Sequence, residues 1–174
     1  AIYDGSDAIM LSGETAVGNY PLECVRMMKS IVSNVEKEIL ENEEFFNLIT
    51  SPDKTNSGNA ICSSAFEMAK DLSLKIMVIM TESGRTGNTM SSFRPSSLIF
   101  AMTPSDKVYR KLSLTWGVVP IKVKKFKSTD QMLKFCRKFL IDNNIIKKGE
   151  QFIMTAGIPV GVTGTTNMIK IETI

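Results

Sequence analysis

Histidine is absent from the 174 residues of this chain. Its absence excludes a Ser-His-Asp or Cys-His catalytic group, and histidine metal ligands, from these residues. Cysteine is scarce, because only Cys24, Cys62 and Cys136 are present, and they lie far apart with no C-x-x-C pair. We therefore expect buried thiols in a reducing cytoplasm, with neither a disulfide framework nor a metal site.

Long apolar runs and strong net charge are also lacking. No stretch approaches the roughly 20 apolar residues that span a membrane. The net charge of +3 is too weak to indicate a nucleic-acid or membrane partner. Because the chain starts at Ala1 without an initiator Met or a signal pattern, we expect a fragment of a longer protein.

The first part of the chain predicts one strand and one helix. A short apolar run at 8–12 predicts a buried strand, and Pro21 suits the first turn of a helix. Apolar residues at steps of three and four extend that helix to about residue 42. An acidic stretch follows, so we expect one domain over 1–42 and a second over 43–174. A short helical piece is expected at 45–50.

From Ser57 onward, continuous apolar strands alternate with helices. This pattern predicts an α/β fold with three layers, in which helices cover both faces of a five-stranded, mostly parallel sheet. The predicted strands are 76–80, 98–102, 118–123, 151–155 and 168–171, and the predicted helices are 57–72, 85–94, 103–115 and 128–148. Because no helix joins the last two strands, we expect the last strand to be antiparallel at an edge and the order to be 3-2-1-4-5.

The glycines at 13 and 18 match half of a phosphate-binding P-loop. A P-loop continues with Lys and Ser or Thr, whereas Asn19 and Tyr20 follow here. Without the lysine charge and the hydroxyl ligand, the P-loop interpretation fails. A strand-to-helix turn at the rim of a barrel, where barrel active sites lie, fits better.

Two loops are candidates for binding a phosphorylated small molecule. Residues 81–86 follow a buried strand and open a helix with three hydroxyls, a glycine and an arginine, which suits an anion, although an ordinary helix cap is equally compatible. The Gly-rich loop at 157–167 allows close approach of a ligand, although by itself a mobile edge connection is favoured. In the predicted order both loops meet where strand order reverses, which is the usual ligand position. Four lysines within 122–127 are interpreted as a solvated strand end.

These motifs resemble pyruvate kinase in its bacterial form. The matching segments are 4–16, 20–23, 81–86, 94–95, 116–118, 147–149 and 164–170, in the family's order across essentially the whole chain. The resemblance implies that 1–42 are the last strand and helix of a (β/α)8 catalytic barrel. Residues 43–174 would then be the C-terminal allosteric and assembly domain.

The resemblance also implies an activity for the whole enzyme. It would be a cytoplasmic, glycolytic homotetramer that transfers a phosphoryl group from phosphoenolpyruvate to ADP, with Mg²⁺ and K⁺. The family's catalytic residues and metal ligands lie upstream of Ala1, so we expect this fragment to be inactive and to bind no metal. Only Ser12, Gly13 and Glu14 would lie near the nucleotide edge, and Val17 replaces a lysine that some relatives carry there.

The family's allosteric site implies which residues hold an effector. Its phosphate loop corresponds to Thr81, Ser83, Gly84, Arg85 and Thr86, with Gly161, Gly164 and Thr165 as candidates from the Gly-rich loop. Relatives that hold fructose bisphosphate tightly often have lysine in place of Glu82. They also use a tryptophan and an arginine within 128–137, where only Arg137 is a candidate. We therefore expect a monophosphate effector or weak regulation.

Two other functions stay open. The chain could be a stand-alone enzyme using 13–18 as a nucleotide site, which a turnover assay with ADP and phosphoenolpyruvate would reveal, and we expect no activity. It could also be a purely structural oligomerisation domain, in which case no anion would bind at 81–86. Because a strand and helix separated from a closed barrel lose their neighbours, we expect 1–42 to be partly disordered, shifted or covered by another copy.

Overall fold

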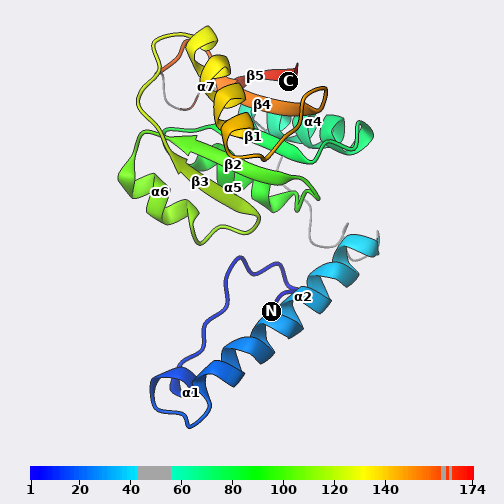
Figure 1. The fold of residues 1–174 in the computed structure, drawn as a ribbon, viewed down its shortest axis with the longest axis vertical. Helices are drawn as coiled ribbons and strands as arrows, with labels where there is room; N and C mark the ends of the chain where they lie inside the picture. The colour runs from blue at the N-terminus through cyan, green and yellow to red at the C-terminus, as the bar shows by residue number, and fades with distance from the viewer. Residues whose placement is uncertain (43–55, 162–163, 165) are drawn as a thin grey trace. The chain divides into compact units, whose positions relative to one another are not determined.

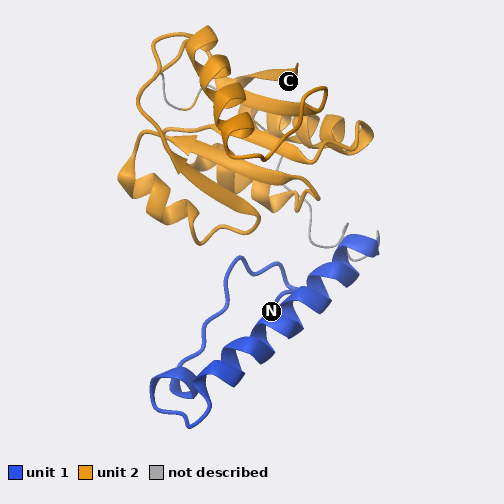
Figure 2. Cartoon of the chain, in the orientation of Figure 1, with its two compact units in different colours: residues 1–51 blue, residues 52–174 orange. Residues whose placement is uncertain are grey.

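The protein is described by a computed structural model that covers residues 1–42, 56–161, 164 and 166–174 (Figure 1). The chain divides into two compact units, Ala1–Ser51 and Pro52–Ile174, which Figure 2 colours separately. The predicted domain boundary after residue 42 adjoins a segment outside the described residues and stays a prediction. The helical piece expected at 45–50 lies within that segment.

The described part of the first unit contains two helices. They are α1 (Gly13–Ala16) and α2 (Pro21–Glu41), and α2 confirms the helix predicted from Pro21. The Tyr3 hydroxyl donates a hydrogen bond of 2.6 Å to the Glu38 carboxylate, which fastens the N-terminal segment to α2. Apolar side chains of α2 stay exposed in this unit, including Leu22 at 64% and Ile31 at 55%.

The prediction of a buried strand at 8–12 is wrong, because these residues form neither helix nor strand. Met10 is 85% exposed. A strand needs a hydrogen-bonding neighbour, and the described residues of the first unit contain no other strand. The apolar run therefore has no sheet to join within this unit.

The described residues of the second unit form one five-stranded sheet. Its strands are β1 (Ile76–Met80), β2 (Leu98–Thr103), β3 (Val118–Lys122), β4 (Gln151–Gly157) and β5 (Thr166–Thr173). The order β3-β2-β1-β4-β5, parallel except for the antiparallel pair of β4 and β5, confirms the predicted topology. In the centre, Val78 pairs with Phe100 on one side and Met154 on the other. These apolar runs suit strands that are buried on both faces.

Helices cover both faces of the sheet, as predicted. They are α4 (Ser57–Asp71), α5 (Arg85–Ser92), α6 (Asp106–Leu112) and α7 (Thr129–Asp142). Figure 1 shows α7 in front of the sheet and α4 and α5 behind it. On the α7 side, Cys136 and Leu140 belong to one buried cluster with Val78, Phe100 and Met154. This arrangement leaves the ends of the strands open for a site.

The start of α6 corrects a second prediction. This helix was predicted over 103–115 and was therefore expected to begin at Thr103. Instead Thr103 is fully buried as the last residue of β2 and pairs with Lys122 of β3, so the ladder continues further than predicted. The side chain of Ser105 caps α6 by accepting a hydrogen bond of 3.3 Å from the Val108 amide.

Candidate functional site

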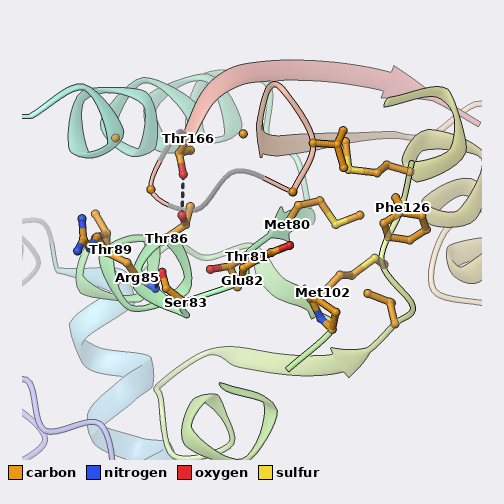
Figure 3. A pocket seen from close by; sticks show the side chains of 18 of the residues that line it. Met80, Thr81, Glu82, Ser83, Arg85, Thr86, Thr89, Met102, Phe126 and Thr166 are labelled. Atoms are coloured by element: carbon orange, nitrogen blue, oxygen red, sulfur yellow. Dashed lines mark hydrogen bonds between the residues drawn. The ribbon is translucent and has the colours of Figure 1, made fainter. Parts of the chain in front are cut away.

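A cavity of about 120 Å³ lies at the carboxyl ends of the central strands of the second unit (Figure 3). Its walls come from the start of α4, the β1–α5 loop, the segment after β3, and the β4–β5 loop. A water molecule needs roughly 10–15 Å³ of such space, so the cavity has room for a small organic ligand. Because β1 lies between β2 and β4, this is the point where the strand order reverses, where open α/β sheets bind ligands.

Thr81 shapes the loop between β1 and α5. Its backbone amide donates to the Met102 carbonyl at 3.0 Å, and its buried side-chain hydroxyl accepts from the Gly84 amide at 2.9 Å. Gly84 has φ of +83°, a left-handed conformation that favours glycine. The predicted binding residue Thr81 therefore holds the turn in place, and the amide of Arg85, the next residue after Gly84, donates to the Ser83 hydroxyl at 3.4 Å.

The first turn of α5 supplies the polar end of the cavity. Ser83, Arg85 and Thr86 line it, and Ser83 and Arg85 are exposed. The Thr86 hydroxyl lies 2.8 Å from the hydroxyl of Thr166 at the start of β5, as the dashed line in Figure 3 marks. Unpaired amides at a helix N-terminus attract anions, so this end of the cavity suits a phosphate group.

The Gly-rich loop reaches the same cavity from the opposite side. Gly161 and Gly164 both line it, with φ of +87° and +84°, whereas Thr165 lies outside the described residues. The Asn167 side chain accepts from the Ile158 amide at 2.8 Å and donates to the Ile158 carbonyl at 2.7 Å, which closes the base of the loop. The two loops predicted to meet are therefore brought together.

Two further groups of lining residues were not predicted. Asn56 and Asn59, at the start of α4, line the cavity, and Asn56 caps that helix by accepting a hydrogen bond of 2.9 Å from the Asn59 amide. In the sequence, Asn56 before a helical pattern indicates only the start of a helix, and nothing in its neighbourhood indicates a binding site. Lys124 and Lys125 also line the cavity, although the lysine run was interpreted as a solvated strand end.

Positive charge dominates the described lining. The charged lining residues are three cations, Arg85, Lys124 and Lys125, and one carboxylate, Glu82. They give the lining a net charge of +2. Glu82 is paired with Lys125 at 4.0 Å. A phosphate monoester carries a charge of about −1.5 to −2 near neutral pH, so one phosphate group matches this balance.

Apolar side chains form the other end of the cavity. Figure 3 shows Met80, Met102 and Phe126 together, away from the hydroxyl-rich start of α5. Cys62 also lines the cavity, and burial raises the pKa of its thiol to about 12. Its sulfur is therefore a neutral thiol near pH 7 and not a nucleophilic thiolate.

Comparison with known proteins identifies the family. Residues 59–172 match the family described as pyruvate kinase, alpha/beta domain. The chain belongs to this family. It is 39% identical over 174 residues to a pyruvate kinase of Clostridium acetobutylicum and 43% identical over 175 residues to one of Staphylococcus aureus.

These alignments cover 100% and 99% of the chain but only 37% and 29% of the two relatives. The chain thus spans about a third of the length of the curated relatives it matches. The resemblance inferred from its motifs is confirmed, and the cavity lies within the part that the family model matches, apart from Asn56 and Gly58.

The residues predicted near the nucleotide edge belong to the first unit. Ser12 precedes α1, and its amide donates a hydrogen bond of 3.0 Å to the Glu14 carboxylate. Backbone hydrogen bonds, first from its own amide and then from that of Ser12, lower the pKa of Glu14. A Cβ on Gly18 would lie 2.4 Å from the Glu14 carbonyl oxygen, so this glycine is required by the turn. The contacts of this segment are those of a tight structural turn.

Arg137, the one arginine considered for a second phosphate, has a structural role. It donates a hydrogen bond of 2.6 Å to the Thr173 carbonyl and pairs with Glu172 at 2.9 Å, which joins α7 to β5. It does not line the cavity. The described residues of this pyruvate kinase domain contain no group of three or more acidic or cysteine side chains arranged to hold a metal ion, and no described helix is long and apolar enough to cross a membrane.

Proposed function

We propose that this chain is the effector-binding and assembly part of a pyruvate kinase. The observation that carries the proposal is the cavity at the reversal of strand order, which combines hydroxyls, helix N-terminal amides and a net charge of +2. A phosphate group would be held by the first turn of α5, through Ser83, Arg85 and Thr86. Thr81 and Gly84 would keep those groups in position.

The same charges favour an effector with a single phosphate. Two phosphate groups would together carry about −3 to −4, which exceeds the net charge of +2 on the cavity lining. The Glu82 carboxylate would also repel the second phosphate. Arg137 is already engaged with Thr173 and Glu172. Fructose 1,6-bisphosphate is therefore expected to bind less tightly than a monophosphate.

The whole enzyme is proposed to transfer a phosphoryl group from phosphoenolpyruvate to ADP in the cytoplasm, as the family name of its relatives implies. Mg²⁺ and K⁺ would neutralise the transferred phosphoryl group there. None of the described residues is assigned as a metal ligand or as a catalytic residue. We propose that residues 1–42 belong to the catalytic barrel and residues 43–174 to the effector domain, so the chain alone is expected to be inactive.

Assembly into a tetramer is the second part of the proposal. Its support is the exposed apolar side of α2, where Leu22 and Val25 are each more than half exposed in the first unit. Faces of this kind are usually covered in an assembled protein. The alternative function is a purely structural oligomerisation domain. A measurement of effector binding distinguishes the two functions, because only the proposed one requires it.

Isothermal titration calorimetry of the whole chain with inorganic phosphate, ribose 5-phosphate and fructose 1,6-bisphosphate tests the proposal. Arg85→Ala is expected to weaken binding of inorganic phosphate and of ribose 5-phosphate by about 10- to 100-fold, because it removes a charge-assisted hydrogen bond. Ser83→Ala is expected to weaken it by about fivefold.

Two exposed residues that do not line the cavity provide matched controls. Ser92→Ala, on the same helix, and Arg110→Ala, on α6, are expected to leave affinity unchanged. Absence of binding for all three ligands would favour the structural alternative. Tight binding of the bisphosphate alone would contradict the single-phosphate assignment.

A further inference from the structure

Three sulfur atoms meet between α7 and the sheet. The Cys136 Sγ atom of α7 lies 3.7 Å from the Met102 Sδ atom of β2 and 4.0 Å from the Met154 Sδ atom of β4. These two strands are not neighbours, because β1 lies between them, so separate parts of the sheet direct their thioethers at one thiol. All three side chains are 1% exposed or less. They form a buried sulfur cluster of one thiol and two thioethers.

The spacing within the sulfur cluster suits a shared metal ion. Metal–sulfur bonds are about 2.3 Å long, so three sulfurs around one ion in a plane lie about 4.0 Å apart. Both separations from the Cys136 sulfur are close to this value. Methionine has three rotatable side-chain bonds, which let each thioether turn toward an ion without a shift of the backbone. The cluster therefore has the spacing of a three-coordinate sulfur site.

The donor atoms select the kind of ion. Thiolate and thioether are soft ligands that bind Cu(I), whereas Mg²⁺ and Ca²⁺ take oxygen ligands. One thiolate neutralises the single charge of Cu(I), so the complex adds no net charge to the apolar core. A Zn²⁺ ion on the same ligands would leave one positive charge buried without a partner, which is costly. In the binding step Cu(I) replaces the thiol proton, which passes to the solvent, and no electron is transferred.

The cavity provides an entry path to the sulfur cluster. Met102 belongs both to the cluster and to the cavity lining. Met80 and Met132 line the same cavity, and both pack in the apolar core around Cys136. Figure 3 shows Met80 and Met102 together at the apolar end of the cavity. An ion can therefore pass from the cavity to Cys136 by exchange between thioethers, each of which is a Cu(I) ligand.

We infer that Cys136, Met102 and Met154 form a Cu(I)-binding site beside the apolar end of the cavity. The bound ion joins α7 to β2 and β4. The inference departs from the expectation that this chain binds no metal, because that expectation rested on cysteine and histidine and not on methionine sulfur. It does not depend on the proposed effector function. Its ion is distinct from the Mg²⁺ and K⁺ of the whole enzyme, for which no ligand is assigned.

Anaerobic competition with the chelator bicinchoninate measures the Cu(I) affinity of the whole chain. The Cys24→Ser chain is the reference, because the half-buried Cys24 thiol would also bind Cu(I). We expect one ion per chain. Met102→Leu and Met154→Leu, which nearly keep the side-chain volume, should each weaken binding about tenfold, and Cys136→Ser about 100-fold, because each variant removes one ligand.

Met90→Leu and Cys62→Ser are the matched controls. Met90 is fully buried on α5 but lies outside the core group that contains Cys136. Cys62 is a buried thiol that lines the cavity. Both variants are expected to leave the Cu(I) affinity unchanged.

Spectra of methyl-labelled methionine locate the ion without a variant. The Met102 and Met154 signals are expected to shift on addition of one equivalent of Cu(I), because the methyl group of a ligating methionine is bonded to the sulfur that binds the ion. The Met90 signal is expected to stay in place and serves as the reference.

Two results would overturn the site. The first is unchanged affinity in Cys136→Ser, or a loss in Cys62→Ser instead. The second is a loss in Cys136→Ser with normal binding by both leucine variants and unmoved methionine signals, which would show an isolated thiol. If Cys136→Ser does not fold, the leucine variants and the methionine signals decide.

Discussion

Gly84 is the residue on which the geometry of the cavity depends. Its φ of +83° disfavours any residue with a Cβ, and an added Cβ would lie 3.2 Å from Val108 Cγ1. We expect Gly84→Ala to lower the free energy of unfolding by about 2 kcal/mol and to abolish most phosphate binding, because the amides of the α5 turn would move. Urea denaturation and calorimetry measure the two effects.

Gly149 offers a matched control for this prediction. Its φ is +89°, but an added Cβ would meet nothing within 4 Å, so Gly149→Ala isolates the backbone cost. That variant is expected to lose about 1 kcal/mol of stability and to bind phosphate normally. Equal stability losses, together with normal binding by Gly84→Ala, would show that the turn tolerates a side chain.

The cysteines differ in their expected reactivity. Burial raises the pKa of Cys62 and Cys136 from 9.0 to about 12. At pH 8 only about one molecule in ten thousand then carries either thiolate. We expect iodoacetamide to label half-buried Cys24 and to spare the other two, as peptide mass spectrometry would show.

The same shift has a consequence for stability. Because the folded pKa lies above the unfolded value, thiol burial stabilises the fold fully below about pH 9, and this contribution declines as pH rises toward 12. In urea at pH 8 all three cysteines are expected to react at similar rates. Labelling of Cys62 as fast as Cys24 in the folded chain would contradict its burial.

At the scale of elements, the start of α4 combines a helix cap with the cavity wall. The Asn56 side chain accepts the Asn59 amide hydrogen bond at 2.9 Å. Asn56→Ala is expected to cost about 1 kcal/mol of unfolding free energy and to weaken phosphate binding severalfold, because the α4 terminus helps to form the site. Denaturation and calorimetry on the same variant test both effects.

Ser128 caps α7 in the same way, with a hydrogen bond of 3.3 Å from the Gln131 amide, but it does not line the cavity. Ser128→Ala should therefore cost similar stability and leave phosphate affinity unchanged. If both variants weaken binding equally, the effect comes from general destabilisation and not from the position of α4.

The central elements were predictable because their signals are local. β1 coincides with the predicted 76–80, since five consecutive apolar residues suit a strand that is buried on both faces. The antiparallel direction of β5 could be predicted because no helix lies between β4 and β5 in the sequence. By contrast, residues 8–12 carry an equally apolar pattern but form no strand, because a strand also needs neighbours that sequence pattern alone does not supply.

The site was predictable only in part for a similar reason. Residues 81–86 adjoin a strand and a helix in sequence, so the chemistry of a phosphate turn could be recognised locally. The contributions of Lys125 and Phe126 depend on the path of the chain after β3, and that of Asn56 depends on where α4 starts over the sheet. Such long-range approaches follow from the assembled sheet and leave no local sequence signal.

At the scale of the whole molecule, the two units are expected to differ in independence. The second unit has its own buried core on both faces of a complete sheet, whereas in the first unit the described part has one long helix with an exposed apolar side. We expect a chain of residues 52–174 to fold cooperatively and to bind phosphate with unchanged affinity. The core and all described lining residues lie within that range.

The apolar side of α2 leads to the final prediction, which concerns self-association. If this side is buried between copies of the chain, Leu22→Lys together with Val25→Lys should shift sedimentation toward the monomer, because burying a lysine in an apolar contact is costly. Urea unfolding of the second unit and phosphate affinity should stay unchanged, since neither residue belongs to that unit. A matched double substitution at exposed polar positions on another side of the same helix, Ser30→Ala with Asn34→Ala, should leave sedimentation unaltered. Unchanged association of the lysine variant would place the assembly contacts on the second unit instead.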